Sequence, residues 1–298
     1  MNCDHGYMEL QQMRYVVAIA EEGSFTRAAQ RCFVVQSSLS HQVKALEREL
    51  GVTLFARSSR RVELTPAGEA FVDAARVSLA AAERAAADAA AAMGEIRGTL
   101  TIGMIPTVTA IDVPAAIADF HRAHPQVRIN LKDVNSDTSI ASIIAGRMDV
   151  AVLGLPDTAA PEGVESRIVA RERLVVVVHS GHRLARRKRL RLSELGEETF
   201  VDFPAGTPGR IQSDAAFDRA GVRREVAFEA MGPRLILDLV RHGLVVAMLA
   251  PAVVPDDPGV VAVAVEDGPV RVEYLAWSGF NPSPAALAFL DHPALQGN

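Results

Sequence analysis

The chain is poor in cysteine: its 298 residues include only Cys3 and Cys32. Two thiols exclude a disulfide scaffold and a four-cysteine zinc module. No apolar run reaches the roughly 18 residues that a membrane-spanning helix needs. Residues 1–7, which include Asp4 and His5, lack the apolar core of a signal peptide. Together these absences predict a cytoplasmic protein.

Short catalytic motifs are also missing. The chain has no Gly-x-Ser-x-Gly turn, no His-Glu-x-x-His pair, no glycine-rich phosphate loop and no dinucleotide-binding glycine pattern. His179 and His182 are close in sequence, but no acid or thiol near them completes a metal site. We therefore expect no enzymatic activity, no catalytic residue, no metal and no cofactor.

The chain divides into three zones of different composition. Residues 8–66 hold short helical patterns, residues 67–97 contain fourteen alanines and no proline, and residues 98–298 alternate β-branched runs with helical stretches. In the last zone we expect strands at 100–105, 127–131, 149–153, 174–178, 200–203, 226–228 and 244–249. Strands separated by helices are typical of βαβ units with mainly parallel sheets. Because the order strand–helix–strand–helix–strand occurs twice, two similar α/β subdomains are predicted.

The first zone predicts consecutive short helices and then a hairpin. Ser24 is a suitable N-cap for a helix over 25–31. A further helix, ended by Gly51, carries an apolar seam at helical spacing. That seam comprises Leu39, Val43, Leu46 and Leu50, and the opposite face carries Ser37, Ser40, His41, Gln42 and Lys44. A helix with small hydrogen-bonding groups and a cation on its outer face suits the major groove of DNA.

Positive charge is concentrated in the same zone. Between Ser24 and Pro66, seven cations face three acids, a local charge of +4 in a chain whose net charge is −5. Arg57, Arg60 and Arg61 lie between the strands expected at 53–55 and 62–64. They predict a wing that contacts phosphates. A solvated hairpin tip is the alternative interpretation.

Four segments resemble the LysR-type transcriptional regulators. They are SFTRAA at 24–29, QSSLSHQVKALE at 36–47, GVTLFAR at 51–57 and LTPAG at 64–68. Weaker similarity continues through the alanine-rich helix, and then at 100–103, 124–125, 146–151 and 182–185, so that the resemblance covers about residues 8 to 290.

The resemblance implies an α+α/β chain with three parts. These are a winged helix-turn-helix DNA-binding domain over 8–66, a linker and dimerisation helix over 67–97, and an effector-binding regulatory domain over 98–298. The regulatory domain would consist of two Rossmann-like α/β subdomains, as in periplasmic binding proteins. One would span about 98–168 plus 267–298, and the other about 169–266.

The function implied is sequence-specific regulation of transcription in response to a small molecule bound between the two subdomains. The expected partners are double-stranded operator DNA and the protein itself, as a homodimer or a homotetramer built as a dimer of dimers, with RNA polymerase as a candidate. The DNA contacts implied are Ser24, Thr26, Arg27, Gln36, Ser37, Ser40, His41, Lys44, Arg57, Arg60 and Arg61. The linker seam proposed for dimerisation is Phe71, Ala75, Leu79, Ala82, Ala86 and Ala89, with an ordinary core helix as the alternative.

The effector contacts are expected where strands end and helices begin, since helix N-termini offer free backbone N–H groups there. The residues expected are Thr107, Thr109, Ser136, Pro204, Ala205, Gly206 and Thr207. They predict a small anionic effector, with a carboxylate as the candidate group. Each is equally consistent with a helix cap. Asp112 would oppose an anion if it faced inward.

Some positions depart from the family's pattern. Val35 stands where a Ser or Thr usually caps the recognition helix, so Ser37 is an alternative cap. His41 replaces a frequent Arg, which would alter base preference. Cys32 is expected to be a small buried hydrophobic residue, and without a cysteine beyond it the regulatory domain cannot sense through a thiol. The competing function is a small-molecule binding or transport module in which the N-terminal helices only oligomerise.

Overall fold

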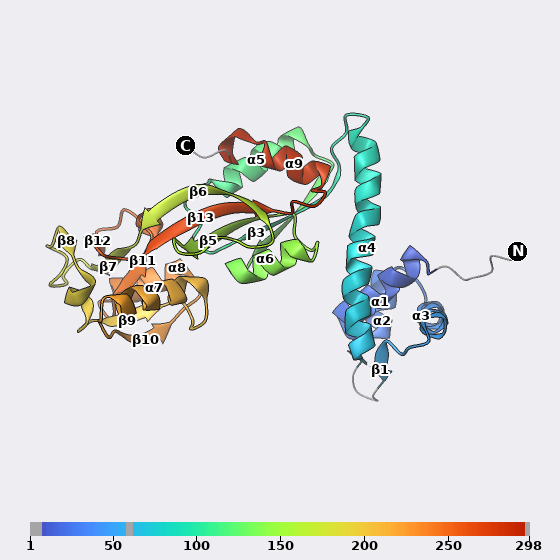
Figure 1. Ribbon diagram of the computed structural model, residues 1–298, viewed down its shortest axis with the longest axis horizontal. Helices are drawn as coiled ribbons and strands as arrows, with labels where there is room; N and C mark the ends of the chain where they lie inside the picture. The colour runs from blue at the N-terminus through green and yellow to red at the C-terminus, as the bar shows by residue number, and fades with distance from the viewer. Residues whose placement is uncertain (1–7, 58–61, 296–298) are drawn as a thin grey trace, which may run out of the picture. The chain divides into compact units, whose positions relative to one another are not determined.

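The computed structural model describes residues 8–57 and 62–295 (Figure 1). They form two compact units: the first ends at Met93 and also includes Ala145–Arg147, and the second contains the remaining residues from Gly94 onward. The first unit contains helices α1 (Leu10–Glu22), α2 (Phe25–Arg31) and α3 (Gln36–Leu50), the strands β1 (Phe55–Arg57) and β2 (Val62–Leu64), and the long helix α4 (Pro66–Ala91). Helices α1 to α3 followed by an antiparallel hairpin form the predicted winged helix-turn-helix.

The core of the first unit lies between α1, α2 and α3. Ser24 caps α2 by accepting a hydrogen bond from the backbone N–H of Arg27, as predicted. Leu39, Val43 and Leu46 are fully buried against α1. Leu50, the fourth member of the predicted seam, is 38% exposed, because it lies in the last turn of α3 before Gly51 ends the helix.

Helix α4 begins in close contact with the hairpin. Thr65 caps it by accepting from the N–H of Gly68, with Pro66 at the first helical position. A Cβ at Gly68 would lie 2.0 Å from the carbonyl oxygen of Leu54, so only glycine permits this approach. The helix continues for 26 residues, about 39 Å at 1.5 Å per residue.

The second unit contains two three-layer α/β subdomains. Subdomain I has a five-stranded sheet in the order β4-β3-β5-β13-β6. Its elements are β3 (Gly98–Met104), α5 (Val113–Ala123), β4 (Val127–Asp133), α6 (Ser136–Ile144), β5 (Val150–Pro156), β6 (Glu165–Arg173), β13 (Val270–Trp277) and α9 (Pro284–Leu290). Helices α5 and α9 cover one face of the sheet and α6 covers the other.

Subdomain II has a four-stranded sheet, β11-β7-β12-β8, beside the pair β10-β9. Its elements are β7 (Val175–His179), β8 (Arg189–Leu190), β9 (Thr199–Asp202), α7 (Pro208–Arg219), β10 (Glu225–Glu229), α8 (Pro233–Arg241), β11 (Ala247–Leu249) and β12 (Val260–Val265). Short 3₁₀ helices lie at Leu192–Leu195, Pro251–Val253 and Pro293–Leu295. Helices α7 and α8 pack on opposite faces of the sheet strands.

All seven strands predicted in residues 98–298 are present, but the expectation of mainly parallel sheets was wrong. Strands β6, β8, β12 and β13 were not predicted. The antiparallel pairs β5–β13 and β13–β6 make the sheet of subdomain I mixed, and the antiparallel pair β7–β12 does the same in subdomain II. The pair β13–β6 extends to Arg173↔Val270. If each strand is assigned to the subdomain whose sheet it joins, the chain passes from subdomain I to subdomain II after residue 173 and returns before residue 270. The predicted boundaries lay a few residues earlier, after residue 168 and before residue 267.

Among residues 8–57 and 62–295, no helix combines the length and the apolar character needed to cross a membrane.

Candidate functional site

The outer face of α3 is open to solvent. Gln36, Ser37, His41 and Lys44 are exposed, and Ser40 is half-buried. Glu47, the acid on the same helix nearest to the hairpin, accepts the backbone N–H groups of Leu54 and Phe55 at 2.8 and 3.4 Å. Its charge is thus used to hold the start of β1, while the cation and the hydrogen-bonding groups of α3 stay accessible.

Helix α3 begins without a side-chain cap. Val35 occupies the N-cap position with extended backbone, and no side chain accepts the N–H groups of the first turn. Ser37 is not the cap, so the helix starts at Gln36. Free first-turn N–H groups at the positive end of a helix dipole form an anion site, which suits a DNA phosphate. The departure at Val35 therefore leaves an additional donor group at this end of α3.

Two of the seven cations between Ser24 and Pro66 already have acidic partners. Arg27 lies 3.5 Å from Glu22, and Arg31 lies 2.7 Å from Glu21 and 3.4 Å from Glu22. Both acids belong to α1 and lie just outside the segment that was counted. The effective local charge is therefore lower than +4. Ser24 is half-buried at its cap, and Thr26 is exposed on α2.

The wing is only partly described. Arg57 ends β1, and its backbone pairs with that of Val62. Arg60 and Arg61 lie outside the described residues, so their assignment to DNA phosphates stays a prediction. Cys32 ends α2, where it is half-buried against the core of the unit, and burial raises the pKa of its thiol.

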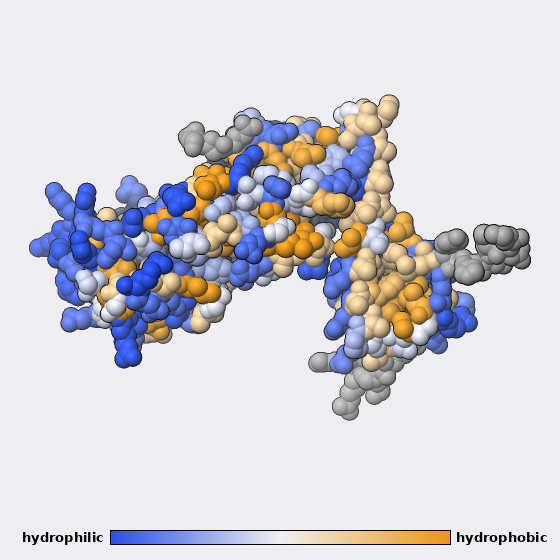
Figure 2. Space-filling view, in the orientation of Figure 1, coloured by the Kyte–Doolittle hydropathy of each residue, from blue (hydrophilic) through white to orange (hydrophobic). Residues whose placement is uncertain are grey.

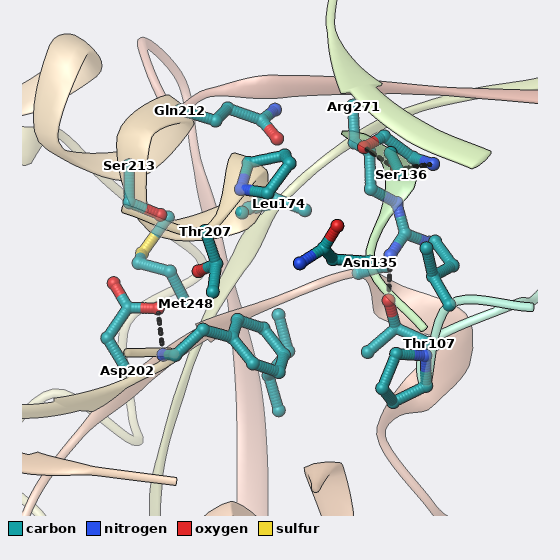
Figure 3. Close-up of a pocket in the computed structure, with 18 of the residues that line it drawn as sticks. Thr107, Asn135, Ser136, Leu174, Asp202, Thr207, Gln212, Ser213, Met248 and Arg271 are labelled. Atoms are coloured by element: carbon teal, nitrogen blue, oxygen red, sulfur yellow. Dashed lines mark hydrogen bonds between the residues drawn. The ribbon is translucent and has the colours of Figure 1, made fainter. Parts of the chain in front are cut away.

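In the second unit, a cavity lies between the two subdomains (Figure 3). Subdomain I contributes Ile105, Pro106, Thr107, Asn135, Ser136, Gly154 and Arg271, and subdomain II contributes Leu174, Asp202, Phe203, Thr207, Pro208, Gly209, Gln212, Ser213, Met231, Met248, Leu249 and Ala250. The space open to the centres of water molecules is about 80 Å³. Because one water needs roughly 10–15 Å³ by this measure, the cavity has room for a small ligand.

Arg271 links the wall of subdomain I to the loop after β3. Its Nη1 donates to Thr107 Oγ1 at 2.7 Å, and its Nη2 donates to the Glu273 carboxylate and lies 3.4 Å from Glu172. Glu273 is 1% exposed and accepts both the N–H and the hydroxyl of Thr109, at 3.2 and 2.7 Å. Two carboxylates therefore balance the guanidinium charge within the protein.

The first residues of α6 meet the cavity from the same side. Asn135 Oδ1 accepts the N–H of Thr138 at 2.8 Å and so caps the helix, which leaves the amide nitrogen of Asn135 free of that bond. Ser136 is 1% exposed, and its hydroxyl donates to Gly154 O at 3.1 Å and accepts from Gly154 N at 3.0 Å. Ser136 therefore joins α6 to β5 as well as lining the cavity.

On the side of subdomain II, Asp202 forms a buried ion pair. Its Oδ2 lies 2.7 Å from Arg224 Nη2, and both side chains are at most 4% exposed. The Arg224 guanidinium packs over the rings of Phe200 and Phe217, with its carbon 5.4 and 5.0 Å from their centroids. Burial raises the pKa of Asp202, against the opposing effects of Arg224 and of the Phe203 N–H that it accepts.

Helix α7 begins at the cavity without a side-chain cap. Thr207 occupies the N-cap position, but its hydroxyl donates to Pro204 O at 2.8 Å instead of accepting from the helix. Gly209 in the first turn and Gln212 in the second both line the cavity. Gln212 is 4% exposed, and its Nε2 makes no hydrogen bond with any residue of the described chain.

The structure brings three of the seven predicted effector contacts to the cavity: Thr107, Ser136 and Thr207. The other four do not line it. Thr109 is bonded to Glu273, and Pro204, Ala205 and Gly206 form the turn before α7, where Ala205 and Gly206 are exposed. Asp112 is exposed and caps α5 by accepting from Ala115 N at 3.0 Å, so it does not face the ligand space.

Sequence reasoning missed Asp202, Gln212 and Arg271. Asp202 had a usable signal, because it is the one charged residue inside the strand predicted at 200–203. Arg271 alternates with apolar residues in β13, a strand that was not predicted. Gln212 is one polar residue in a helix with many, and nothing in the local pattern distinguishes it. Within residues 8–57 and 62–295, no cluster of acids, histidines and thiols is arranged to hold a metal ion.

Comparisons with known proteins agree across both units. The LysR substrate binding domain matches residues 93–294, and the bacterial regulatory helix-turn-helix protein of the lysR family matches residues 10–69. The chain is 33% identical over 292 residues to YnfL, an uncharacterised HTH-type transcriptional regulator of Escherichia coli strain K12, covering 96% of this chain and 97% of YnfL. Its fold is similar to a variant of full-length OxyR from Pseudomonas aeruginosa (TM-score 0.72, 25% identity, 97% of each chain). It is also similar to full-length CbnR complexed with its target DNA (TM-score 0.69, 26% identity, 96% of this chain and 98% of CbnR).

Proposed function

The chain belongs to the LysR family of bacterial transcriptional regulators, and from this premise we propose where its two functions reside. The protein is a DNA-binding transcriptional regulator whose activity responds to a small-molecule effector, and the family is not enzymatic. We propose that the exposed face of α3 reads operator bases. The free N–H groups at the start of α3 and the wing arginines would then hold backbone phosphates.

We propose that the effector binds in the cavity between the subdomains. The observation that supports this most directly is that groups from both subdomains line one cavity, so that a ligand there would bias their relative position. The cavity is lined at the ends of β3 and β9 and at the starts of α6 and α7, which is the place where open α/β sheets bind ligands. A thiol-based response is not part of this proposal, because residues 98–298 contain no cysteine.

The carboxylate expected from the sequence has one supporting feature, the uncapped first turn of α7, whose N–H groups would donate hydrogen bonds to an oxyanion. It lacks another. The one cation in the described lining, Arg271, is already balanced by Glu273 and Glu172. For self-association, we propose that two protomers form a dimer through α4 and that two such dimers associate into a tetramer.

His41→Ala is expected to relax the preferred base at about one position of each half-site, a loss of about 5- to 150-fold in discrimination, because an exposed side chain on α3 reads a base edge. Arg60→Ala is expected instead to weaken binding to all sequences and to reduce the salt slope by about one unit. Site selection from randomised DNA measures the first effect, and mobility shifts with the DNA upstream of the gene at several salt concentrations measure the second.

Gln11→Ala, at an exposed position on α1, is the matched control and should bind like the parent protein. The assignment of α3 to base contacts fails if His41→Ala selects the same sites with the same affinity as the parent. It fails equally if Arg60→Ala alters sequence preference without altering the salt slope.

Thr107→Val is expected to abolish the effector response while leaving operator binding intact. Valine keeps the shape of Thr107 but removes the oxygen that accepts from Arg271, so the guanidinium loses one of its fixed partners at the cavity wall. The measurement is expression from a reporter under the upstream promoter, with a compound that induces the parent protein. Thr138→Val, on the exposed side of α6, is the control. An unchanged dose response in Thr107→Val would refute this site.

A further inference from the structure

Two side-chain carboxamides reach the effector cavity from opposite subdomains (Figure 3). Gln212 extends from α7 in subdomain II, and Asn135 lies at the start of α6 in subdomain I. Gln212 is 4% exposed, with its Nε2 lacking any hydrogen-bond partner in the described chain. Buried polar groups without a partner are rare in folded proteins, so Gln212 points to a ligand that satisfies it.

Asn135 is oriented by its own helix. Its Oδ1 accepts from Thr138 N at 2.8 Å, which fixes which end of the carboxamide is engaged. The amide nitrogen is then the end available to a ligand, and it can only donate. The Nε2 of Gln212, which has no hydrogen-bond partner in the described chain, can donate to a ligand, and its Oε1 can accept.

The cavity offers no uncompensated charge to a ligand. Arg271 and Asp202 are the ionisable residues of the described lining. Arg271 is held by Glu273 and Glu172, and Asp202 lies 2.7 Å from Arg224. An anion that enters loses its hydration and meets only the Arg271 guanidinium, whose charge two carboxylates already balance although its Nε has no hydrogen-bond partner in the described chain. A cation meets only the carboxylate of Asp202, which is paired with Arg224.

The remaining walls are largely apolar. They include Ile105, Leu174, Phe203, Met231, Met248 and Leu249. Such walls favour burial of hydrocarbon, and the polar groups then fix the orientation of the ligand.

We propose that the effector is an uncharged molecule with an apolar body that carries a hydrogen-bond donor and an acceptor side by side, as an amide, a lactam or a ureide does. Gln212 forms a reciprocal pair with the two groups, and the Asn135 amide donates to the acceptor oxygen. The ligand thereby bridges α7 and α6. This inference rests on the proposed function, since it assigns a chemical class to the effector of the same cavity, and it departs from the carboxylate expected from the sequence.

The test uses matched pairs of small amides and carboxylates of the same shape: acetamide and acetate, isobutyramide and isobutyrate, benzamide and benzoate. Binding to the full-length protein is measured by titration calorimetry at neutral pH. We expect at least one amide to bind about tenfold or more tightly than its acid. Gln212→Leu should remove that preference, because leucine has a similar volume and no hydrogen-bonding group.

Gln212→Lys should reverse the preference, since it places in the cavity a cation that no carboxylate balances. Ile211→Lys is the matched control: it adds the same charge on the same helix at a residue that is 51% exposed and outside the lining, and it should leave the preference for the amide unchanged. If Gln212→Lys fails to fold, Asn135→Leu at a half-buried position takes its place and should lower amide affinity.

The inference is overturned if any acid binds more tightly than its amide, if the Gln212 variants discriminate as the parent does, or if no amide in the series binds better than its acid, including a series in which nothing binds. Mobility shifts on the upstream DNA separate this from the proposed function. Acids that bind and alter operator affinity would refute the inference and support the proposed function. Amides that bind through Gln212 without any change in operator affinity or transcription would support the assigned ligand chemistry of the cavity and refute the proposed function of the cavity as the effector site.

Discussion

Replacing Arg224 with methionine is expected to lower the thermal unfolding midpoint of the effector-binding domain by about 6–20 °C. Arg224 is 4% exposed and pairs with Asp202, which is 2% exposed, at 2.7 Å. Removing one partner of a buried ion pair costs about 3–5 kcal/mol, because the other charge stays buried without compensation. A domain of this size loses roughly 2–4 °C for each kcal/mol. Methionine keeps an apolar contact with Phe200 and Phe217 but supplies no charge.

The effect of Arg224→Met should depend on pH. Burial raises the pKa of Asp202 in the folded protein. For an acid whose folded pKa is raised, the stabilising contribution is fully present below its ordinary value and is lost as pH rises through the raised value. Without the guanidinium that opposes this shift, the pKa of Asp202 rises further. The difference between variant and parent should therefore be smaller at pH 5 than at pH 8, as scanning fluorimetry at both pH values would measure.

A second substitution separates loss of charge balance from loss of packing. Arg224 also lies 2.6 Å from Asp214, but that carboxylate is 43% exposed and keeps Arg210 as a partner at 2.9 Å. In the double variant Arg224→Met, Asp202→Asn no buried carboxylate therefore remains uncompensated, so much of the lost stability should return. Arg219→Met, an exposed position at the end of α7, should stay within a few degrees of the parent. A single variant as stable as the parent, or a double variant no more stable than the single one, would contradict the assigned role of the pair.

The winged helix-turn-helix could be predicted from sequence because its signals are local. Ser24 and Thr65 cap helices, glycines at 23 and 51 adopt positive φ at their ends, and the α3 seam repeats within a few residues. The local charge of +4 was a less reliable guide to the DNA-binding surface than these caps and the α3 seam. Glu21 and Glu22 lie one short turn away, yet they neutralise Arg31, because α1 and α2 pack against one another.

The cavity between the subdomains was predicted only in part, because its groups come from distant segments. Thr107 and Arg271 are separated by 164 positions and meet because β13 returns from subdomain II to pair with β5. In sequence, the Arg and Glu of β13 resemble solvent-facing residues of an alternating strand. In the structure they are buried and bonded to one another and to the loop at 107–110. The burial of Arg271 and Glu273 is favourable because they bond to each other and to a loop that is distant in sequence, and the local sequence of β13 does not reveal those partners.

Self-association provides the other large effect: Leu79→Glu, Ala82→Glu is expected to convert the protein to a monomer of 31.9 kDa and to lower operator affinity by on the order of a hundredfold or more. The first turns of α4 are used within the protomer, since Val72 is buried and Phe71 packs in the core of the first unit. Phe71 and Ala75, which open the predicted seam, are thus less available to a partner than Leu79 and the alanines that follow it.

Beyond Leu79, α4 presents small apolar side chains along much of its length (Figure 2). Small residues allow two helices to approach closely, and a pair of glutamates in each helix would bury four like charges in that contact. Ala74→Glu, Ala81→Glu, at exposed positions seven residues apart on another face of α4, adds the same charge and should remain associated. Light scattering measures the mass of both variants. One recognition helix reads too few base pairs for specificity, so a monomer should also lose operator binding. A seam variant that keeps the parent's mass and operator affinity would show that α4 does not carry the dimer.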